Sequence, residues 1–174
     1  MYLHEVKSIE DVDYIKTFFH DIFPEEPKYD CVDFLNSVTG QHPYNYLKYF
    51  LASVDNDIVG FCGIYSNKSD EGWLGWLGVK PQFRRKGYAK EMLSKLKILM
   101  LENGFRYCRL YTDKKLNNNA YLLYKKLGFI EDSFYKYDFV TMVKDLTGMR
   151  ITPDKYWKEK TPLGFESEDP HYAV

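Results

Sequence analysis

The chain has 174 residues, of which 45% are hydrophobic and 28% charged, the composition of an ordinary globular protein with a buried core. Its net charge of −1 gives no general attraction to nucleic acid or membranes, and no apolar run is long enough to span a bilayer. The cysteines Cys31, Cys62 and Cys108 form no C-x-x-C pair, and the histidines show no ligand spacing. We therefore expect no metal and a reducing, cytoplasmic environment.

The first third of the chain predicts a strand and two helices. Residues 1–6 alternate loosely in polarity, and Ser8 with Asp11 has the spacing of a capping box at a helix start. The helix that follows ends at Pro24 and places five apolar residues on one face: Val12, Ile15, Phe18, Phe19 and Ile22. A second, short helix is predicted from Asp30 to Val38.

Four strands and one long helix follow. Segments 46–54 and 58–65 flank a polar turn and predict a hairpin, and residues 73–79 predict a third strand. A helix with an apolar stripe is predicted over 89–102, before a strand over 105–112. Since a helix joins the last two strands, we expect them to be parallel.

The C-terminal part predicts a short helix over 117–127 and two strands over 130–143. Residues 147–174 carry three prolines and many charges, which predicts an irregular tail. Because no repeat or clear linker interrupts the pattern, we expect one domain over 1–146. Residues 147–174 are then an extension that packs on this domain or on a partner.

The most informative stretch is the basic turn before the helix 89–102. A helix start exposes N–H groups that have no partner within the helix, and the helix dipole adds positive charge there. Between Lys80 and Lys97 the sequence has seven basic residues and one acidic residue. Gly87 lets a ligand approach the backbone closely. The pattern predicts a phosphate or pyrophosphate site, with a basic, solvated turn as the alternative.

Two motifs resemble those of the GCN5-related N-acetyltransferases, the GNAT family. The stretch Arg84-x-x-Gly87-x-Ala89, preceded by Val79-x-Pro81, is similar to the acyl-CoA-binding motif of that family. A second stretch fits the family further along the chain: Asn117-x-x-Ala120-x-x-Leu123-Tyr124, followed by Gly128-Phe129. The resemblance is clear over residues 73–146, loose over the first fifty residues and absent in the tail.

The resemblance implies a mixed α/β fold, with about seven mostly antiparallel strands around a central parallel pair, flanked by helices. It also implies acetyl-CoA as co-substrate and no metal. Leu77, Gly78 and Val79 would pair with the pantetheine arm, with Gly78 permitting an irregular backbone and the Val79 N–H polarising the thioester carbonyl. The pyrophosphate would lie on the turn residues Arg84, Arg85, Lys86, Gly87, Tyr88 and Ala89.

By the same resemblance, Tyr124 is the candidate general acid that protonates the CoA thiolate, and Asn117 and Ala120 lie beside the cofactor. The residues alone leave two other interpretations open, a core tyrosine for Tyr124 and a helix cap for Asn117. Cys108 is a conceivable acyl-enzyme nucleophile, but a strand cysteine without a neighbouring histidine favours a structural role.

No acid lies inside the strand 73–79, where relatives often carry a general-base glutamate. The nearest acids are Asp70 and Glu71, and strand alternation places Glu71 on the face of Trp73 and Val79. Glu71 is therefore the candidate base, acting through water, with a surface turn residue as the alternative. An amine with a low enough pKa would need no dedicated base.

The predicted function is direct transfer of an acetyl group to a primary amine of a small molecule or peptide, in a ternary complex, by a monomer or homodimer. Five acidic residues and one lysine between Asp21 and Asp33 favour a cationic amine, or form a solvated loop. The resemblance places Phe23, Glu25, Glu26 and Tyr29 near that acceptor. The alternative is a non-catalytic acyl-CoA-binding sensor or partner module. No nucleic-acid or membrane partner is expected.

Overall fold

The structure is a computed structural model that describes residues 1–115, 118–136 and 139–151. The contacts between residues divide the chain into two compact units. Unit 1 comprises residues 1–66 and 74–99, and unit 2 comprises residues 67–73 and the described residues between 100 and 151. This division does not test the expected domain over 1–146 or the extension 147–174, which stay predictions.

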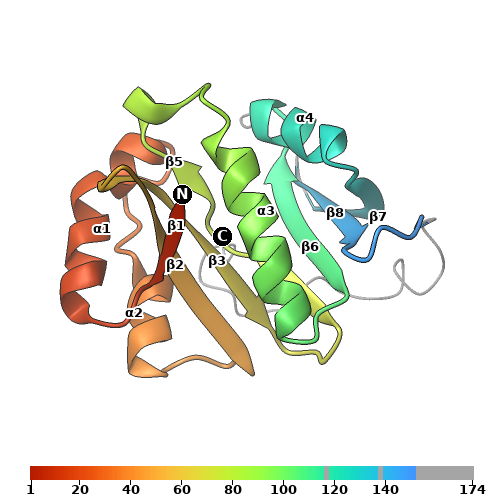
Figure 1. Cartoon of the computed structure of the whole chain (residues 1–174), viewed down its shortest axis with the longest axis horizontal. Helices are drawn as coiled ribbons and strands as arrows, with labels where there is room; N and C mark the ends of the chain where they lie inside the picture. The colour runs from red at the N-terminus through yellow and green to blue at the C-terminus, as the bar shows by residue number, and fades with distance from the viewer. Residues whose placement is uncertain (116–117, 137–138, 152–174) are drawn as a thin grey trace. The chain divides into compact units, whose positions relative to one another are not determined.

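The described residues form eight strands, mostly antiparallel, and four α-helices (Figure 1). One strand pair is parallel. The predicted mixed α/β class is therefore confirmed. About seven strands were predicted and eight are present, because residues 73–79 form parts of two strands rather than one.

The strands of unit 1 are antiparallel. β1 (Tyr2–Glu5) pairs with β2 (Tyr46–Val54), β2 pairs with β3 (Asp57–Ser66), and β3 pairs with the short β5 (Gly78–Val79). The β2–β3 hairpin turns at Asp55 and Asn56, whose φ angles of 50° and 69° are left-handed. Asp and Asn tolerate this conformation better than other side chains, so the predicted hairpin is confirmed, and Figure 1 shows its strands side by side.

The helices of unit 1 follow the predicted apolar patterns. α1 (Ile9–Ile22) begins with the expected capping box, in which the Ser8 hydroxyl accepts the Asp11 N–H at 3.2 Å. All five predicted face residues of α1 are buried. α2 (Val32–Thr39) begins two residues after the predicted start, because Cys31, with a left-handed φ of 54°, turns the chain into the helix. α3 (Tyr88–Glu102) follows the 3-10 turn η1 (Pro81–Phe83).

The predicted strand 73–79 is interrupted. β4 (Glu71–Leu74) ends before Gly75 and pairs with β6, whereas β5 begins at Gly78 and pairs with β3. A Cβ on Gly75 would lie 2.9 Å from the Tyr49 hydroxyl, and one on Gly78 would lie 2.5 Å from Cγ2 of Ile22. Close packing therefore requires glycine at both positions, which is a different reason from the irregular backbone expected at Gly78.

Unit 2 contains the parallel pair. β4 runs parallel to β6 (Tyr107–Asp113), with Trp73 opposite Arg109, which confirms the expected crossover. β6 pairs with β8 (Phe139–Asp145), and β8 pairs with β7 (Ile130–Lys136), both antiparallel. α4 (Asn118–Lys126) packs against β6 (Figure 1).

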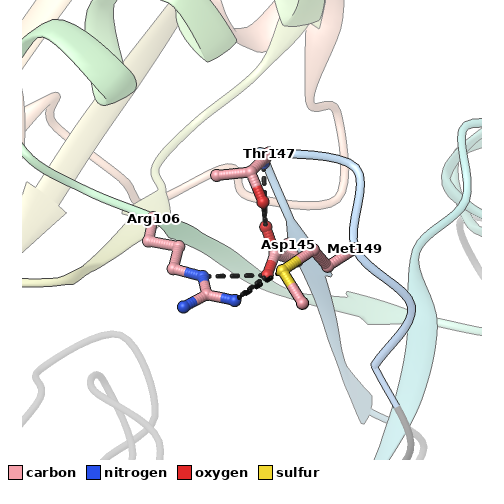
Figure 2. A network of polar contacts seen from close by, with 4 residues as sticks. All are labelled: Arg106, Asp145, Thr147 and Met149. Atoms are coloured by element: carbon pink, nitrogen blue, oxygen red, sulfur yellow. Dashed lines mark hydrogen bonds and ion pairs between the residues drawn. The ribbon is translucent and has the colours of Figure 1, made fainter.

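Figure 2 shows a polar network at the end of β8. Nε and Nη2 of Arg106 each lie 2.9 Å from Oδ2 of Asp145, and Oδ1 of Asp145 accepts the Thr147 N–H at 2.8 Å. Burial alone would raise the pKa of Asp145, but the hydrogen bonds from Thr147 and Arg106 outweigh it and hold that pKa below its usual value. Arg106 also contacts the sulfur of Met149. The network fixes the first residues after β8, while 152–174 lie outside the described residues.

Candidate active site

The predicted phosphate turn lies between η1 and α3 in unit 1. Two of its residues have left-handed backbones, Arg85 with φ 65° and Gly87 with φ 87°. Glycine adopts this conformation freely, whereas a residue with a side chain is strained there by about 1–2 kcal/mol. Turns that alternate in this way direct successive N–H groups into one concave surface, which favours an anion.

The start of α3 presents N–H groups in the same place. The first hydrogen bond of the helix runs from the Glu91 N–H to the Gly87 carbonyl at 3.1 Å, so the N–H groups of Tyr88, Ala89 and Lys90 precede it. A Cβ built on Gly87 meets no atom within 4 Å, so the backbone faces open space there. Arg85 and Lys86 are exposed and add positive charge. The turn has the donors, the charge and the access that a pyrophosphate requires.

Arg84, although part of the motif, makes its hydrogen bonds within the protein. Its Nε donates to the Val79 carbonyl and its Nη2 to the Ile22 carbonyl, each at 3.0 Å. The guanidinium therefore links the phosphate turn to β5 and to the last residue of α1. Its role as a source of phosphate-binding charge stays a prediction, and its contacts favour positioning of the turn.

β5 presents one backbone edge away from β3. The Lys80 N–H donates to the Val59 carbonyl at 2.9 Å, and Val79 lies opposite Gly60. In this antiparallel register the N–H and carbonyl of Val79 point to the side away from β3. The carbonyl accepts from Arg84, which fixes the peptide orientation. Leu77 and Val79 are half-buried and Gly78 is buried.

Tyr124 lies on α4 in unit 2 and is 6% exposed. Its ring packs edge-on against Phe129 at 5.7 Å between centroids. Burial, followed by the nearby Cys108, raises the pKa of the phenol, so the hydroxyl stays protonated at neutral pH. The structure records no hydrogen bond from this hydroxyl to any described residue. Ala120 lies one turn earlier and is half-buried, and Asn117 falls outside the described residues.

Glu71 is the first residue of β4 and is 1% exposed, so the alternative of a surface turn residue is wrong. Its Oε1 accepts the indole N–H of Trp73 at 3.1 Å and lies 3.7 Å from Nη1 of Arg109, which is fully buried. Lys68 approaches the same oxygen at 3.5 Å. The guanidinium also lies 4.7 Å from the Trp73 ring centroid. These contacts favour a structural role, and the role of base stays a prediction.

Sequence reasoning missed the residues that contact the acids Glu71 and Asp33 in the fold. Arg109 faces Glu71 only through the parallel register of β4 and β6, and no pattern in the sequence predicts that pairing. Asp33 of α2 bonds to Trp76, 43 residues away. Phe23 is half-buried and Tyr29 is buried, whereas Glu25 and Glu26 are exposed.

The structure gives little support to Cys108 as a nucleophile or to a metal site among the described residues. Cys108 is buried, and burial raises the pKa of its thiol to about 12, which keeps it protonated and poorly nucleophilic. Within the part of the chain that the structure describes, no three His, Cys, Asp or Glu side chains form a group that could hold a metal ion. None of the described helices is long and apolar enough to cross a bilayer.

Solved structures with the same fold are acetyltransferases. Aminoglycoside 6'-acetyltransferase type Ii is 18% identical, with a TM-score of 0.67 over 84% of this chain and 97% of that chain. The PaiA N-acetyltransferase of Thermoplasma acidophilum, in complex with coenzyme A, is 20% identical, with a TM-score of 0.61 over 83% and 99%. The N-acetyltransferase PseH of Campylobacter jejuni, in complex with acetyl coenzyme A, is 20% identical, with a TM-score of 0.60 over 83% and 97%. At this identity the similarity establishes the fold.

The family follows from the sequence. Residues 4–129, more than half of the chain, match the acetyltransferase (GNAT) family. The chain therefore belongs to the GNAT family of acetyltransferases, which confirms the resemblance of the two motifs. No curated protein sequence matches the chain.

Proposed function

We propose that this protein transfers the acetyl group of acetyl-CoA to a primary amine of a small molecule or peptide, in a ternary complex. The observation that carries the proposal is the phosphate turn, with its two left-handed residues, its open Gly87 and the N–H groups at the start of α3. The motif at this turn is the one that resembles the acyl-CoA-binding motif of the family. Two solved relatives of the same fold hold coenzyme A or acetyl coenzyme A.

In the proposed complex the turn residues 84–89 hold the pyrophosphate, and Leu77, Gly78 and Val79 pair with the pantetheine arm. The Val79 N–H lies on the edge of β5 that faces away from β3 and donates to the thioester carbonyl oxygen. A donor held in place by the protein stabilises the charge that develops on this oxygen during attack. Arg84 supports this role because it fixes the Val79 peptide.

The proposed reaction is a direct attack. The neutral amine nitrogen bonds to the thioester carbon, the C–S bond breaks, and the nitrogen loses a proton to solvent. Tyr124 donates its phenolic proton to the CoA thiolate and recovers a proton from solvent. Its raised pKa keeps that proton in place before the reaction, and Asn117 and Ala120 are proposed to contact the cofactor. Glu71 stays a candidate base, although its contacts with Arg109 and Trp73 make proton loss to water the simpler route.

The cellular setting is proposed from the sequence. We propose a cytoplasmic enzyme that acts as a monomer or homodimer, uses no metal and forms one domain over 1–146. The extension 147–174 would pack on this domain or on a partner. A non-catalytic acyl-CoA-binding module is the second candidate, because no acid lies in the segment 72–79.

Turnover decides between the two candidates. The purified protein is incubated with acetyl-CoA and a panel of primary amines, while thiol release and the mass of the acetylated amine are followed. We expect acetylated product and matching thiol release with at least one amine. Binding of acetyl-CoA without product from any amine would favour the binding module. Release of thiol without acetylated amine would show hydrolysis rather than transfer.

A further inference from the structure

Arg84 bridges the end of α1 and the edge of β5, all within unit 1. Its Nε donates to the Val79 carbonyl and its Nη2 to the Ile22 carbonyl, each at 3.0 Å. Ile22 is the last residue of α1, and a helix end of this kind attracts a cation. Although Arg84 is an exposed residue, two nitrogens of its planar guanidinium thus hold two backbone carbonyls that are far apart in the sequence.

The bond to Val79 lies on the edge of β5 that the thioester is proposed to meet. Among the described strands β5 pairs with β3 alone, and the N–H and carbonyl of Val79 both point away from β3. The N–H belongs to the peptide before Val79 and the carbonyl to the peptide after it. The bond from Arg84 to the carbonyl therefore restricts the rotation of the residue that carries the N–H.

The end of α1 restricts the same N–H from the other side. This N–H belongs to the peptide that links Gly78 to Val79. A Cβ built on Gly78 would lie 2.5 Å from Cγ2 of Ile22 and 3.0 Å from Cε2 of Phe23, so these side chains pack directly on that backbone. Because Arg84 bonds to Ile22 as well as to Val79, it joins the two restraints that flank the N–H.

A second basic residue attaches the start of η1 to α1 without Arg84. The Nζ of Lys80 donates to the Tyr14 hydroxyl at 3.3 Å and lies 3.9 Å from the centroid of the Phe18 ring. The Lys80 N–H also donates to a carbonyl of β3 at 2.9 Å. Loss of the Arg84 guanidinium should therefore leave this segment on the fold and release only the two carbonyls that it holds.

We infer that Arg84 is a positioning residue of the proposed reaction, which holds the Val79 N–H in the direction of the thioester carbonyl oxygen. The inference rests on the proposed function and deepens it, because the motif alone assigned Arg84 to the pyrophosphate. A donor that is already fixed stabilises the developing charge without reorganising during the reaction. Loss of the two bonds should therefore lower kcat more than it weakens the binding of acetyl-CoA.

Arg84→Lys separates positioning from charge, since lysine keeps the positive charge but lacks the fork that reaches both carbonyls. We expect kcat, with an amine that the wild type acetylates, to fall about tenfold or more. The Kd for acetyl-CoA, measured by calorimetry, should change less than about threefold. Arg84→Met, which also removes the charge, should lose at least as much kcat. Unchanged kcat in both variants, with a higher Kd in Arg84→Met, would overturn the inference and return Arg84 to the pyrophosphate.

Infrared spectroscopy of acetyl-CoA with an isotope label at the thioester carbonyl carbon tests the position of the N–H without an acceptor amine. Binding to the wild type should lower the stretching frequency of this carbonyl, because a hydrogen bond polarises it. The shift should be smaller in Arg84→Lys.

Arg85→Met is the matched control, because Arg85 is an exposed arginine of the same turn. It should weaken the binding of acetyl-CoA and leave the frequency of the bound carbonyl as in the wild type. Equal shifts in the wild type and Arg84→Lys would overturn the inference. Acetyl-CoA bound to a wild type that acetylates no amine would instead overturn the proposed function, and the carbonyl shift would still show whether Arg84 positions the Val79 N–H.

Discussion

The predicted phosphate turn, residues 84–89, and the buried cluster of Glu71, Trp73 and Arg109 (the Glu71 cluster) differ in where their polar groups lie. The turn exposes Arg85 and Lys86 and presents its backbone around Gly87 to open space. In the cluster, a 1% exposed carboxylate faces the fully buried guanidinium of Arg109 at 3.7 Å. The first arrangement has polar groups directed outward to open space, and the second has opposite charges that compensate each other inside the protein.

We expect the Glu71 cluster to contribute to stability and the turn to contribute to ligand binding. A buried charge is costly unless an opposite charge compensates it, so Glu71 and Arg109 are each required by the other. The turn carries the cost of the left-handed backbone at Arg85. Strained backbone of this sort is common where a ligand binds. Substitutions in the two regions should therefore change different measured quantities.

The largest effect is expected in the Glu71 cluster. Glu71→Gln keeps an acceptor for the Trp73 indole but leaves Arg109 buried without this carboxylate. We expect the free energy of unfolding, measured by urea denaturation, to fall by about 3 kcal/mol. The value is at the lower end for buried pairs because 3.7 Å exceeds a hydrogen-bond distance.

Asp13→Asn is the control for this variant, since Asp13 is exposed and its contact with Lys16 is long, at 4.0 Å. It should change stability by less than about 1 kcal/mol. If Glu71→Gln were as stable as the wild type but lost most of its kcat, Glu71 would be the general base and the structural interpretation would fail.

In the turn, Gly87→Glu should act on binding. The substitution adds bulk and negative charge where the pyrophosphate is proposed to lie. We expect the Kd for acetyl-CoA to rise by about 100-fold or more, roughly 3 kcal/mol of binding free energy. Calorimetric titration measures it.

Gly87→Ala separates charge from backbone strain. A Cβ at this position meets no atom, so alanine adds only the strain of φ 87°, about 1–2 kcal/mol. It should bind acetyl-CoA far better than the glutamate variant does. Retained binding by Gly87→Glu would remove the turn from the cofactor site.

Tyr124 belongs to neither group, because it is buried and is nevertheless proposed to act in catalysis. Tyr124→Phe keeps the ring packing on Phe129 and removes only the hydroxyl. We expect kcat to fall at least about tenfold, with little change in acetyl-CoA affinity, because protonation of the thiolate would be lost.

The control on the same helix is Tyr121→Phe, which removes a hydroxyl that donates to Glu131. Its kcat should stay near that of the wild type. An unchanged rate in Tyr124→Phe would make Tyr124 a core residue without a catalytic role.

The smallest effect concerns Asp145 and depends on pH. Its pKa is lower in the folded protein than in the unfolded chain, so its stabilising contribution is present at neutral pH and disappears as the pH falls below about 4. Asp145→Asn should cost about 1 kcal/mol of unfolding free energy at pH 7, because the side chain of its partner Arg106 is 44% exposed and water screens the pair.

At pH 3 the difference between Asp145→Asn and the wild type should shrink. Urea denaturation of both proteins at the two pH values measures this. A difference that stays constant between pH 7 and pH 3 would mean that the charge of Asp145 does not stabilise the fold.

The sequence allowed most of the fold to be predicted where local chemistry decides the structure. The capping box of α1, the left-handed Asp55-Asn56 turn and the parallel relation of β4 and β6 depend on residue type and spacing over short distances. The division of residues 73–79 into two strands depends instead on what packs against Gly75 and Gly78. Such contacts are between residues far apart in sequence and leave no local pattern.

The same distinction applies to the candidate site. The turn at 84–89 was predicted because glycine, basic residues and a helix start occur together in the sequence. The burial of Glu71 beside Arg109 was not predicted, because Arg109 lies 38 residues away and only the pairing of β4 with β6 brings the two together. Arg84 was assigned to the phosphate by its place in the motif and by its charge, and its bonds to Val79 and Ile22 appear only in the fold.

The central claim is that the turn holds the phosphates of acyl-CoA, and direct titration of the wild-type protein tests it. Calorimetry and thermal melting are carried out with acetyl-CoA, desulfo-CoA and ATP. Binding of the two CoA compounds, with a higher melting temperature and little effect of ATP, is the predicted result, since a ligand of the native state raises stability by mass action. No binding and no stabilisation by any of the three would contradict the claim and leave the turn as a basic surface loop.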